Sequence, residues 1–220
     1  MLGEGSAEVN NGGDGANGWV SNDAERHQWD GELRRRLVGR RIARARYVEL
    51  DYEGHPEPMW RGAGFDSLDF GLELDLDDGT TWAFIWNQRG HNEALLVYPG
   101  QLVPSQLCSD AHTAVYDVTD HWHAAGPHVV TTVTPVWMRH RFGPAFSRAG
   151  EQVASSGESD ICLLTLVLTS EGARQAVITL GQREADGRYG YIHDNIVVFF
   201  SVVEAHNARV LMPRDPDAIT

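Results

Sequence analysis

The residues of this chain best suited to chemistry are histidines gathered in one short segment. Asp120-His121-Trp122-His123 is followed five residues later by His128. A His-x-His pair on an extended strand turns both imidazoles to one face, which is how double-stranded β-helix enzymes hold Fe, Mn or Zn. The acidic ligand expected a few residues later is missing, because Ala124-Ala125-Gly126-Pro127 stands there. We therefore expect no cofactor, and keep a divalent metal bound by His121, His123 and His128 as the alternative to surface histidines beside a helical turn.

Complete catalytic motifs are absent from the sequence. It contains no Gly-x-Ser-x-Gly elbow, phosphate-binding loop, CxxC pair or HExxH helix. Histidines do stand beside carboxylates, as His91 precedes Glu93 by two residues, but adjacency alone says little about acid–base catalysis. The sequence favours a binding protein over an enzyme and leaves enzymatic activity undecided.

A Pro- and Gly-rich loop carries the side chains best suited to binding. It runs from Gly54 through Gly64 and includes Met59, Trp60 and Arg61. Trp and Arg are among the residues that dominate interface energetics. We expect such a loop beside a β-meander to form the wall of a peptide-binding groove, so these three are the predicted binding residues, with Trp60 expected to be partly exposed.

Seven arginines lie between Arg34 and Arg46, and every basic residue of the chain is Arg. A phosphate or nucleic-acid patch is one interpretation. The formal charge of −13 argues against it, because that charge repels nucleic acid and anionic membranes. Pairing with the acidic strand face around Glu73 and Asp75 is favoured, with an acidic partner as the alternative. Arg44 and Arg46 therefore join the candidate binding residues.

The elements that position these residues are predicted to be β-strands. Leu72, Leu74 and Leu76 alternate with acidic residues, the period-two pattern of a half-buried strand. Asp77-Asp78-Gly79 then turns the chain, and Trp82, Phe84 and Trp86 face one way on the return strand. An Asp-Gly step between alternating runs is a strong hairpin signal.

The second half repeats this plan. Leu164, Leu166 and Leu168 precede Gly172 as the earlier leucines precede Gly79, which suggests half-repeats at 40–100 and 128–205. The alternative is that any two hairpins of a β protein look alike. We expect an all-β fold: antiparallel meanders forming a sandwich or partly open barrel, with one or two short helices near Glu32–Gly39 and Val118–Ala124. The apolar run Ile196–Val203 is predicted to be a central strand or a subunit contact.

Composition sets the domain boundaries. Residues 1–30 are rich in Gly, Asn, Asp and Ser, so a lead that is disordered or ordered by a partner is expected there, before a β domain at 31–220. No run reaches the ~18 apolar residues of a membrane span. The first residues lack the features of a secretory signal, and two cysteines make no disulfide framework. These features predict a cytoplasmic protein with no membrane contact.

One resemblance bears on function. Phe65-Asp66-Ser67-Leu68-Asp69-Phe70-Gly71-Leu72 leads into Asp78-Gly79, and Asp117-Val118-Thr119-Asp120 is followed by Trp122. In these segments, residues 38–140 resemble an uncharacterised group of bacterial all-β proteins from GC-rich genomes. That group has no assigned activity, and its members look like accessory or immunity-type proteins of natural-product or toxin–immunity gene clusters. The resemblance implies a non-catalytic role and supplies no catalytic residues.

Together, these features predict a non-catalytic protein that binds a peptide or protein and forms a homodimer, or a heterodimer with a similar β chain. A cupin-like metal-dependent enzyme built on the histidine cluster is the alternative. A structural assembly subunit that uses Ile196–Val203 as its contact is the second alternative.

Overall fold

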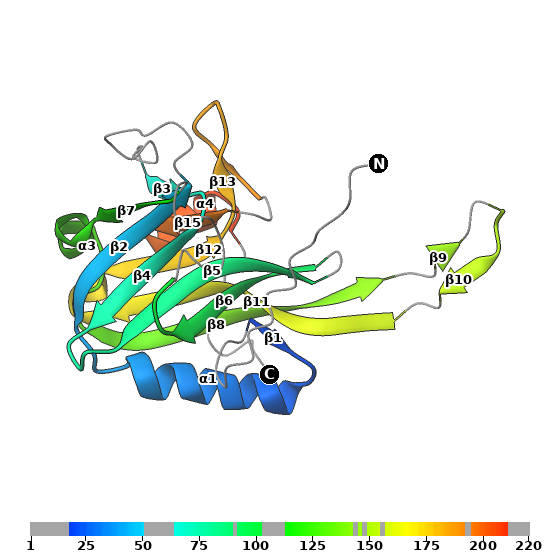
Figure 1. Cartoon of the computed structure of the whole chain (residues 1–220), viewed down its shortest axis with the longest axis horizontal. Helices are drawn as coiled ribbons and strands as arrows, with labels where there is room; N and C mark the ends of the chain where they lie inside the picture. The colour runs from blue at the N-terminus through cyan, green and yellow to red at the C-terminus, as the bar shows by residue number, and fades with distance from the viewer. Residues whose placement is uncertain are drawn as a thin grey trace.

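Two antiparallel β-sheets pack face to face in the computed structural model of the chain (Figure 1). The structure describes residues 18–50, 64–89, 92–102, 113–142, 145–146, 149–154, 157–191 and 195–210. The five-stranded sheet has the order β6-β5-β4-β2-β7. Its strands are β2 (Ile42–Leu50), β4 (Gly71–Leu76), β5 (Thr81–Arg89), β6 (Asn92–Pro99) and β7 (Thr113–Asp117). The predicted all-β sandwich with a few helices is confirmed.

The six-stranded sheet is built around the second half of the chain. Its strands are β1 (Trp19–Val20), β3 (Phe65–Leu68), β8 (Val130–Phe142), β11 (Gly157–Ser170), β12 (Gln175–Leu180) and β15 (Ile196–Phe199). β8 pairs with β11, and the order continues through β12 and β15 to β3 at the opposite edge. Beyond the sandwich, β8 and β11 continue as a two-stranded ribbon toward a small sheet of β9 (Ala145–Phe146) and β10 (Gln152–Ala154) (Figure 1).

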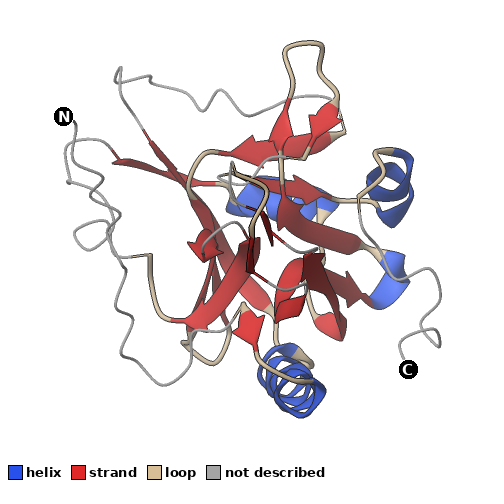
Figure 2. Ribbon diagram, turned by 90° about the vertical axis from the view of Figure 1, so that its right-hand side faces the viewer, coloured by secondary structure: helices blue, strands red, loops and turns tan. Residues whose placement is uncertain are grey.

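The helices and a second small sheet lie around the sandwich (Figure 2). The helices are α1 (Asp23–Leu37), α3 (Thr119–Ala125) and α4 (Val202–Asn207), with a 3-10 turn η2 (Glu171–Ala173). The second small sheet pairs β13 (Gln182–Arg183) with β14 (Tyr189–Gly190). No helix in the described ranges is long and apolar enough to cross a membrane.

The hairpin predicted from alternating leucines is confirmed as β4 and β5. Leu72 stands opposite Phe84 and Leu74 opposite Trp82. Gly79 adopts a φ of 83° at the turn, where its N–H donates to the carbonyl of Leu76 at 3.0 Å. This left-handed conformation suits glycine because it has no Cβ to clash. The leucines face the other sheet and are buried in the core that both sheets share.

Each sheet contains four strands that follow one another both in space and along the chain, once short insertions are set aside. These are β2-β4-β5-β6 in one sheet and β8-β11-β12-β15 in the other. These two sets of four strands lie at the positions of the half-repeats expected at 40–100 and 128–205. That the two halves arose by duplication stays a prediction. β3 breaks the pattern, because it leaves the sheet of its chain neighbours and pairs with β15 across the sandwich.

The expected disordered lead is wrong for residues 18–30. Trp19 and Val20 are buried, each 3% exposed, and pair with Cys162 and Ile161 of β11. α1 begins at Asp23, where the side chain of Asn22 accepts a hydrogen bond from the N–H of Glu25 at 2.9 Å. The helix was expected to begin near Asp30, but Asp30 lies inside it. The polar composition of this segment predicted disorder. One buried tryptophan and one capped helix are nevertheless enough to hold it in place.

The apolar run Ile196–Val203 is a central strand only as far as Phe199. β15 lies between β12 and β3, and all four of its residues are buried. These four residues are therefore not available as a subunit contact. α4 follows at Val202, with the hydroxyl of Ser201 accepting a hydrogen bond from the N–H of Glu204 at 3.3 Å. The prediction of one strand through Val203 is wrong because a helix cap outweighs the β-propensity of two valines.

Candidate ligand-binding site

Of the predicted binding residues, Met59, Trp60 and Arg61 lie outside the described residues. The two arginines predicted with them, Arg44 and Arg46, lie on β2. The histidines of the alternative metal site lie on α3 and just after it.

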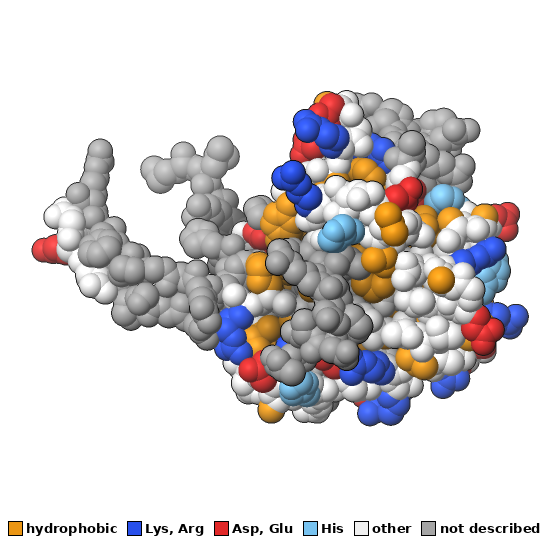
Figure 3. Space-filling model, turned by 180° about the vertical axis from the view of Figure 1, so that it is seen from behind, with side chains coloured by type: hydrophobic (Ala, Val, Ile, Leu, Met, Phe, Trp, Pro, Cys, Tyr) orange, Lys and Arg blue, Asp and Glu red, His pale blue; other side chains and the backbone are white. Residues whose placement is uncertain are grey.

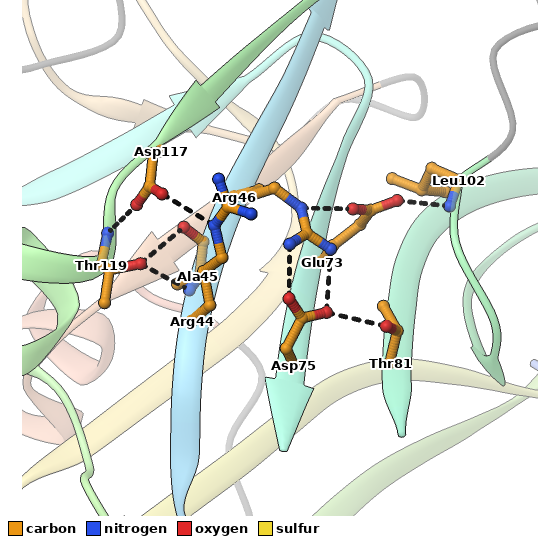
Figure 4. Close-up of polar contacts among 9 residues, drawn as sticks. All are labelled: Arg44, Ala45, Arg46, Glu73, Asp75, Thr81, Leu102, Asp117 and Thr119. Carbon is orange, nitrogen blue, oxygen red and sulfur yellow. Dashed lines mark hydrogen bonds and ion pairs between the residues drawn. The ribbon is translucent and has the colours of Figure 1, made fainter. Parts of the chain in front are cut away.

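Arg46 is part of a buried ionic network on the five-stranded sheet (Figure 4). Its guanidinium donates to Glu73 at 2.8 Å and to Asp75 at 2.8 Å, from positions that are largely buried. Glu73 also accepts a hydrogen bond from the N–H of Leu102 at 2.6 Å, and Asp75 accepts one from Thr81 at 2.7 Å. The hydrogen bond that Arg46 donates to Asp75 is the main cause of the raised pKa of Arg46. Arg46 is therefore structural, and pairing with the acidic strand face is confirmed.

Arg44 lies two residues away and pairs with Asp117 of β7 at 2.7 Å (Figure 4). Both side chains are about half exposed, at 51% and 50%. A hydrogen bond from the hydroxyl of Thr119 is the leading cause of the lowered pKa of Asp117. Exposed ion pairs of this kind contribute little to stability. Arg44 and Arg46 thus form a matched pair that differs in burial.

Arg46→Met is expected to lower the free energy of unfolding by about 3 kcal/mol, because it leaves two carboxylates beside each other without their cation. Arg44→Met, the matched control, is expected to cost less than about 1 kcal/mol. Urea denaturation of both variants and the wild type measures the two losses. Equal losses would show that burial does not set the strength of these ion pairs.

The histidine cluster does not converge on a common point. The Nε2 atom of His123 lies 3.1 Å from the carbonyl oxygen of Ile42, and that of His128 lies 2.6 Å from the carbonyl oxygen of His123. The rings of His123 and His128 stack at 4.8 Å, while His121 turns toward Asp66 at 2.9 Å. Within the described ranges, no three side chains of the metal-binding types gather in one place. Since α3 is helical, the geometry of an extended His-x-His pair is not formed.

His121 belongs instead to a polar network between the two sheets. The Asp66 carboxylate is 3% exposed and accepts a hydrogen bond from the Tyr47 hydroxyl at 2.6 Å. The Tyr47 oxygen in turn accepts one from the indole N–H of Trp122 at 2.9 Å. Burial raises the pKa of Asp66, against the lowering effect of Tyr47 and His121. The network ties β2, β3 and α3 together, with Oδ2 of Asp66 in contact with both Tyr47 and His121, as expected for a buried polar group.

Glu49 is a second buried carboxyl beside this network. It is 8% exposed, accepts a hydrogen bond from the N–H of Asp69 at 2.8 Å, and has one carboxyl oxygen with no hydrogen-bond partner among the described residues. Burial raises its pKa to about 8. The folded protein therefore favours the protonated form of Glu49 over much of the neutral range.

A stability change with pH follows from Glu49. Between its ordinary pKa of 4.5 and the folded value of about 8, the folded chain holds a proton that the unfolded chain has released. Its contribution to stability is thus full below pH 4.5 and falls as pH rises through this window, by at most ~1.4 kcal/mol per pH unit. Glu49→Gln removes this contribution to the pH dependence of the free energy of unfolding. The free energy of unfolding of Glu49→Gln minus that of the wild type is expected to rise from pH 5 to pH 8, in urea titrations. A difference that stays constant with pH would contradict the buried, protonated carboxyl.

The outer face of β3 carries a pocket, which we name the β3–α4 pocket. Its floor is formed by Phe65, Tyr189 and Phe199, and its rim by Arg188, Glu204, Asn207, Ala208 and Arg209. The pocket volume is about 600 Å³, within the roughly 300–1,000 Å³ range of small-ligand pockets. Because side chains alternate along a strand, Phe65 faces this pocket while Asp66 faces the core.

The floor of the β3–α4 pocket is aromatic and firmly held. The ring centroids of Phe65 and Phe199 lie 4.8 Å apart, and that of Tyr189 lies 5.8 Å from Phe199. The Tyr189 hydroxyl donates to the carbonyl of Leu180 at 2.8 Å, and burial raises its pKa to about 12. The guanidinium of Arg183 lies 4.1 Å from the Phe65 centroid and donates to the Phe65 carbonyl. The floor is therefore preformed and apolar.

The rim of the β3–α4 pocket is polar and exposed. Arg188 pairs with Asp186 at 2.6 Å. The side chains of Glu204, Asn207 and Arg209 form no hydrogen bond or ion pair with the described residues. A preformed apolar floor with a few uncommitted polar groups around it is the usual composition of a ligand site.

Sequence reasoning missed this pocket because it placed a strand where α4 stands. The signal was present: Ser201 followed three residues later by Glu204 is the capping-box spacing that starts a helix. A helix there covers the outer face of β15 and brings residues 204–209 over Phe65. The pairing of β3 with β15 had no local signal, because it joins segments about 130 residues apart.

Comparison with known proteins adds no further guide to function. No protein-family model, no curated protein and no solved structure matches the chain.

Proposed function

We propose that this chain is a non-catalytic binding protein that captures a peptide or protein segment, with an apolar side chain of that segment inserted into the β3–α4 pocket. The observation that carries the proposal is the aromatic floor of buried Phe65 and Phe199 and partly buried Tyr189. Above it lie the rim side chains of Glu204, Asn207 and Arg209, which have no partner among the described residues. Aromatic residues in a concave, largely preformed site are the usual anchors of recognition.

The position of the titratable groups favours binding over catalysis. Groups with raised pKa and a charged neighbour tend to mark catalytic sites when they line a cleft. Here Asp66 and Glu49 lie on the core side and do not line the β3–α4 pocket. The Nε2 atom of His121 is directed at Asp66 rather than at a substrate position.

The partner proposed is a peptide, a second copy of this chain or a similar β protein. On the face seen in Figure 3, acidic and basic side chains are mixed, which suits recognition of a particular segment better than attraction by a single-sign field.

The test fills the pocket without removing a core contact. Ala208→Trp adds a large side chain at the rim, and Val203→Trp is the control on the same helix, at a position that is 68% exposed and does not line the pocket. A library of random heptapeptides, attached through either end, is screened for binding to the wild type and both variants. Peptides selected by the wild type are expected to bind Val203→Trp equally and Ala208→Trp at least tenfold more weakly.

Two results would sink the proposal. The first is a set of selected peptides that bind Ala208→Trp as tightly as the wild type, with circular dichroism showing both variants folded. The second is a library from which the wild type selects nothing above background.

A further inference from the structure

We propose that the ligand of the β3–α4 pocket carries a carboxylate next to its apolar side chain, and that Arg209 binds this carboxylate. The inference rests on the proposed function and names the chemistry of the captured group. The C-terminal residue of a peptide has this chemistry, and so does a free amino acid.

The backbone of Arg209 ends α4 in a way that normally calls for glycine. Its N–H donates to the carbonyl of His206 at 2.9 Å, and the N–H of Val210 donates to that of Ala205 at 3.0 Å. These are the two hydrogen bonds of a Schellman motif, accompanied by the expected contact of two buried residues, Ala205 and Val210. The motif needs a left-handed residue at position 209, where Arg209 has a φ of 64°.

Arginine at this position works against the local backbone preference. A Cβ in the left-handed region is crowded by the carbonyl oxygen, so non-glycine residues are uncommon there. The helix end is satisfied by backbone atoms alone, and the guanidinium has no partner among the described residues. Side chains that persist against local preference tend to mark functional positions. Arg209 is one of the residues that line the β3–α4 pocket, so its guanidinium is within reach of a ligand bound there.

The polar side chains of the rim match the carboxylate and the N–H or ammonium group of a bound amino-acid residue. A guanidinium binds a carboxylate with charge-assisted hydrogen bonds, which are stronger than neutral ones. Arg188 is already neutralised by Asp186, so Arg209 is the rim cation that has no carboxylate among the described residues. Glu204 and Asn207 offer acceptors to an N–H or ammonium group. The chain has a formal charge of −13, so an unpaired cation over an apolar floor is a local exception to its overall field.

The test uses one substitution that relieves the backbone and removes the charge together. Arg209→Gly restores the preferred residue of the Schellman motif, so its melting temperature is expected to equal or exceed that of the wild type. Ala173→Gly is the matched control, because Ala173 has a φ of 62° and does not line the pocket. Arg209→Lys keeps the charge and is expected to retain part of the affinity.

Three probes measure recognition of the carboxylate by fluorescence anisotropy. They are a fluorescein-labelled tetraglycyl-phenylalanine peptide with a free C-terminus, the same peptide as its C-terminal amide, and unlabelled L-phenylalanine as competitor. The free acid is expected to bind the wild type and Ala173→Gly equally, and at least tenfold more tightly than the amide does. In Arg209→Gly the acid is expected to bind as weakly as the amide.

The outcomes separate the two proposals. Equal binding of acid and amide, lost in Ala208→Trp, would overturn the carboxylate inference and leave the proposed function standing. A clear drop in the melting temperature of Arg209→Gly would overturn the role of Arg209, because its side chain would then be structural. Failure of every probe to bind would overturn the inference, whereas the peptide library judges the proposed function. Displacement of the peptide by L-phenylalanine at equal or lower concentration would support the carboxylate and assign its source to a free amino acid.

Discussion

The buried carboxylate of Asp66 is the interaction on which the rest of this arrangement depends. It ties a four-residue strand, β3, to β2 and α3 across the sandwich, while the backbone of β3 pairs with β15 in the six-stranded sheet. An ionisable group placed between two sheets loses its hydration, and that loss is offset only when hydrogen bonds replace the lost water. Tyr47 and His121 supply those hydrogen bonds from β2 and α3. Three elements distant in the sequence are thereby fixed around one side chain.

Alternation along β3 carries this constraint to the outer surface. With Asp66 turned inward, Phe65 must face outward, where it stands opposite Phe199 in the register of β3 and β15. α4 then covers the apolar outer face and ends over Phe65. The β3–α4 pocket thus depends on the polar network of Asp66, Tyr47 and His121, because the four residues of β3 contribute to both.

Periodicity in the sequence was sufficient where partners are close along the chain. The β4–β5 hairpin followed from Leu72 through Trp86, and the second hairpin from Leu164 through Leu180, because an alternating run and its turn contain all the information that pairs them. The fold class followed from these hairpins. Arg46 was also found correctly as the partner of an acidic strand face, since Glu73 and Asp75 show their sign in the sequence.

Other features could not be derived from local patterns. β3 pairs with a strand about 130 residues away, and four residues carry no register signal of their own. Residues 18–30 looked too polar to fold, although Trp19 and a capped helix fix them. The residue type at 209 was visible, but its left-handed φ was not, and that conformation is what makes an arginine there unusual. The geometry of the β3–α4 pocket is therefore not visible in the amino-acid composition.

The most direct measurement of the central claim is a titration of ¹⁵N-labelled protein with unlabelled tetraglycyl-phenylalanine, followed by the amide chemical shifts. The account predicts that the shifts change at Phe65, Tyr189, Phe199 and residues 204–210, while those of Tyr47, Glu49 and His121 stay in place. Shift changes centred on Tyr47, Glu49 and His121 would contradict the assignment of the β3–α4 pocket as the binding site. So would the absence of any shift change at saturating peptide.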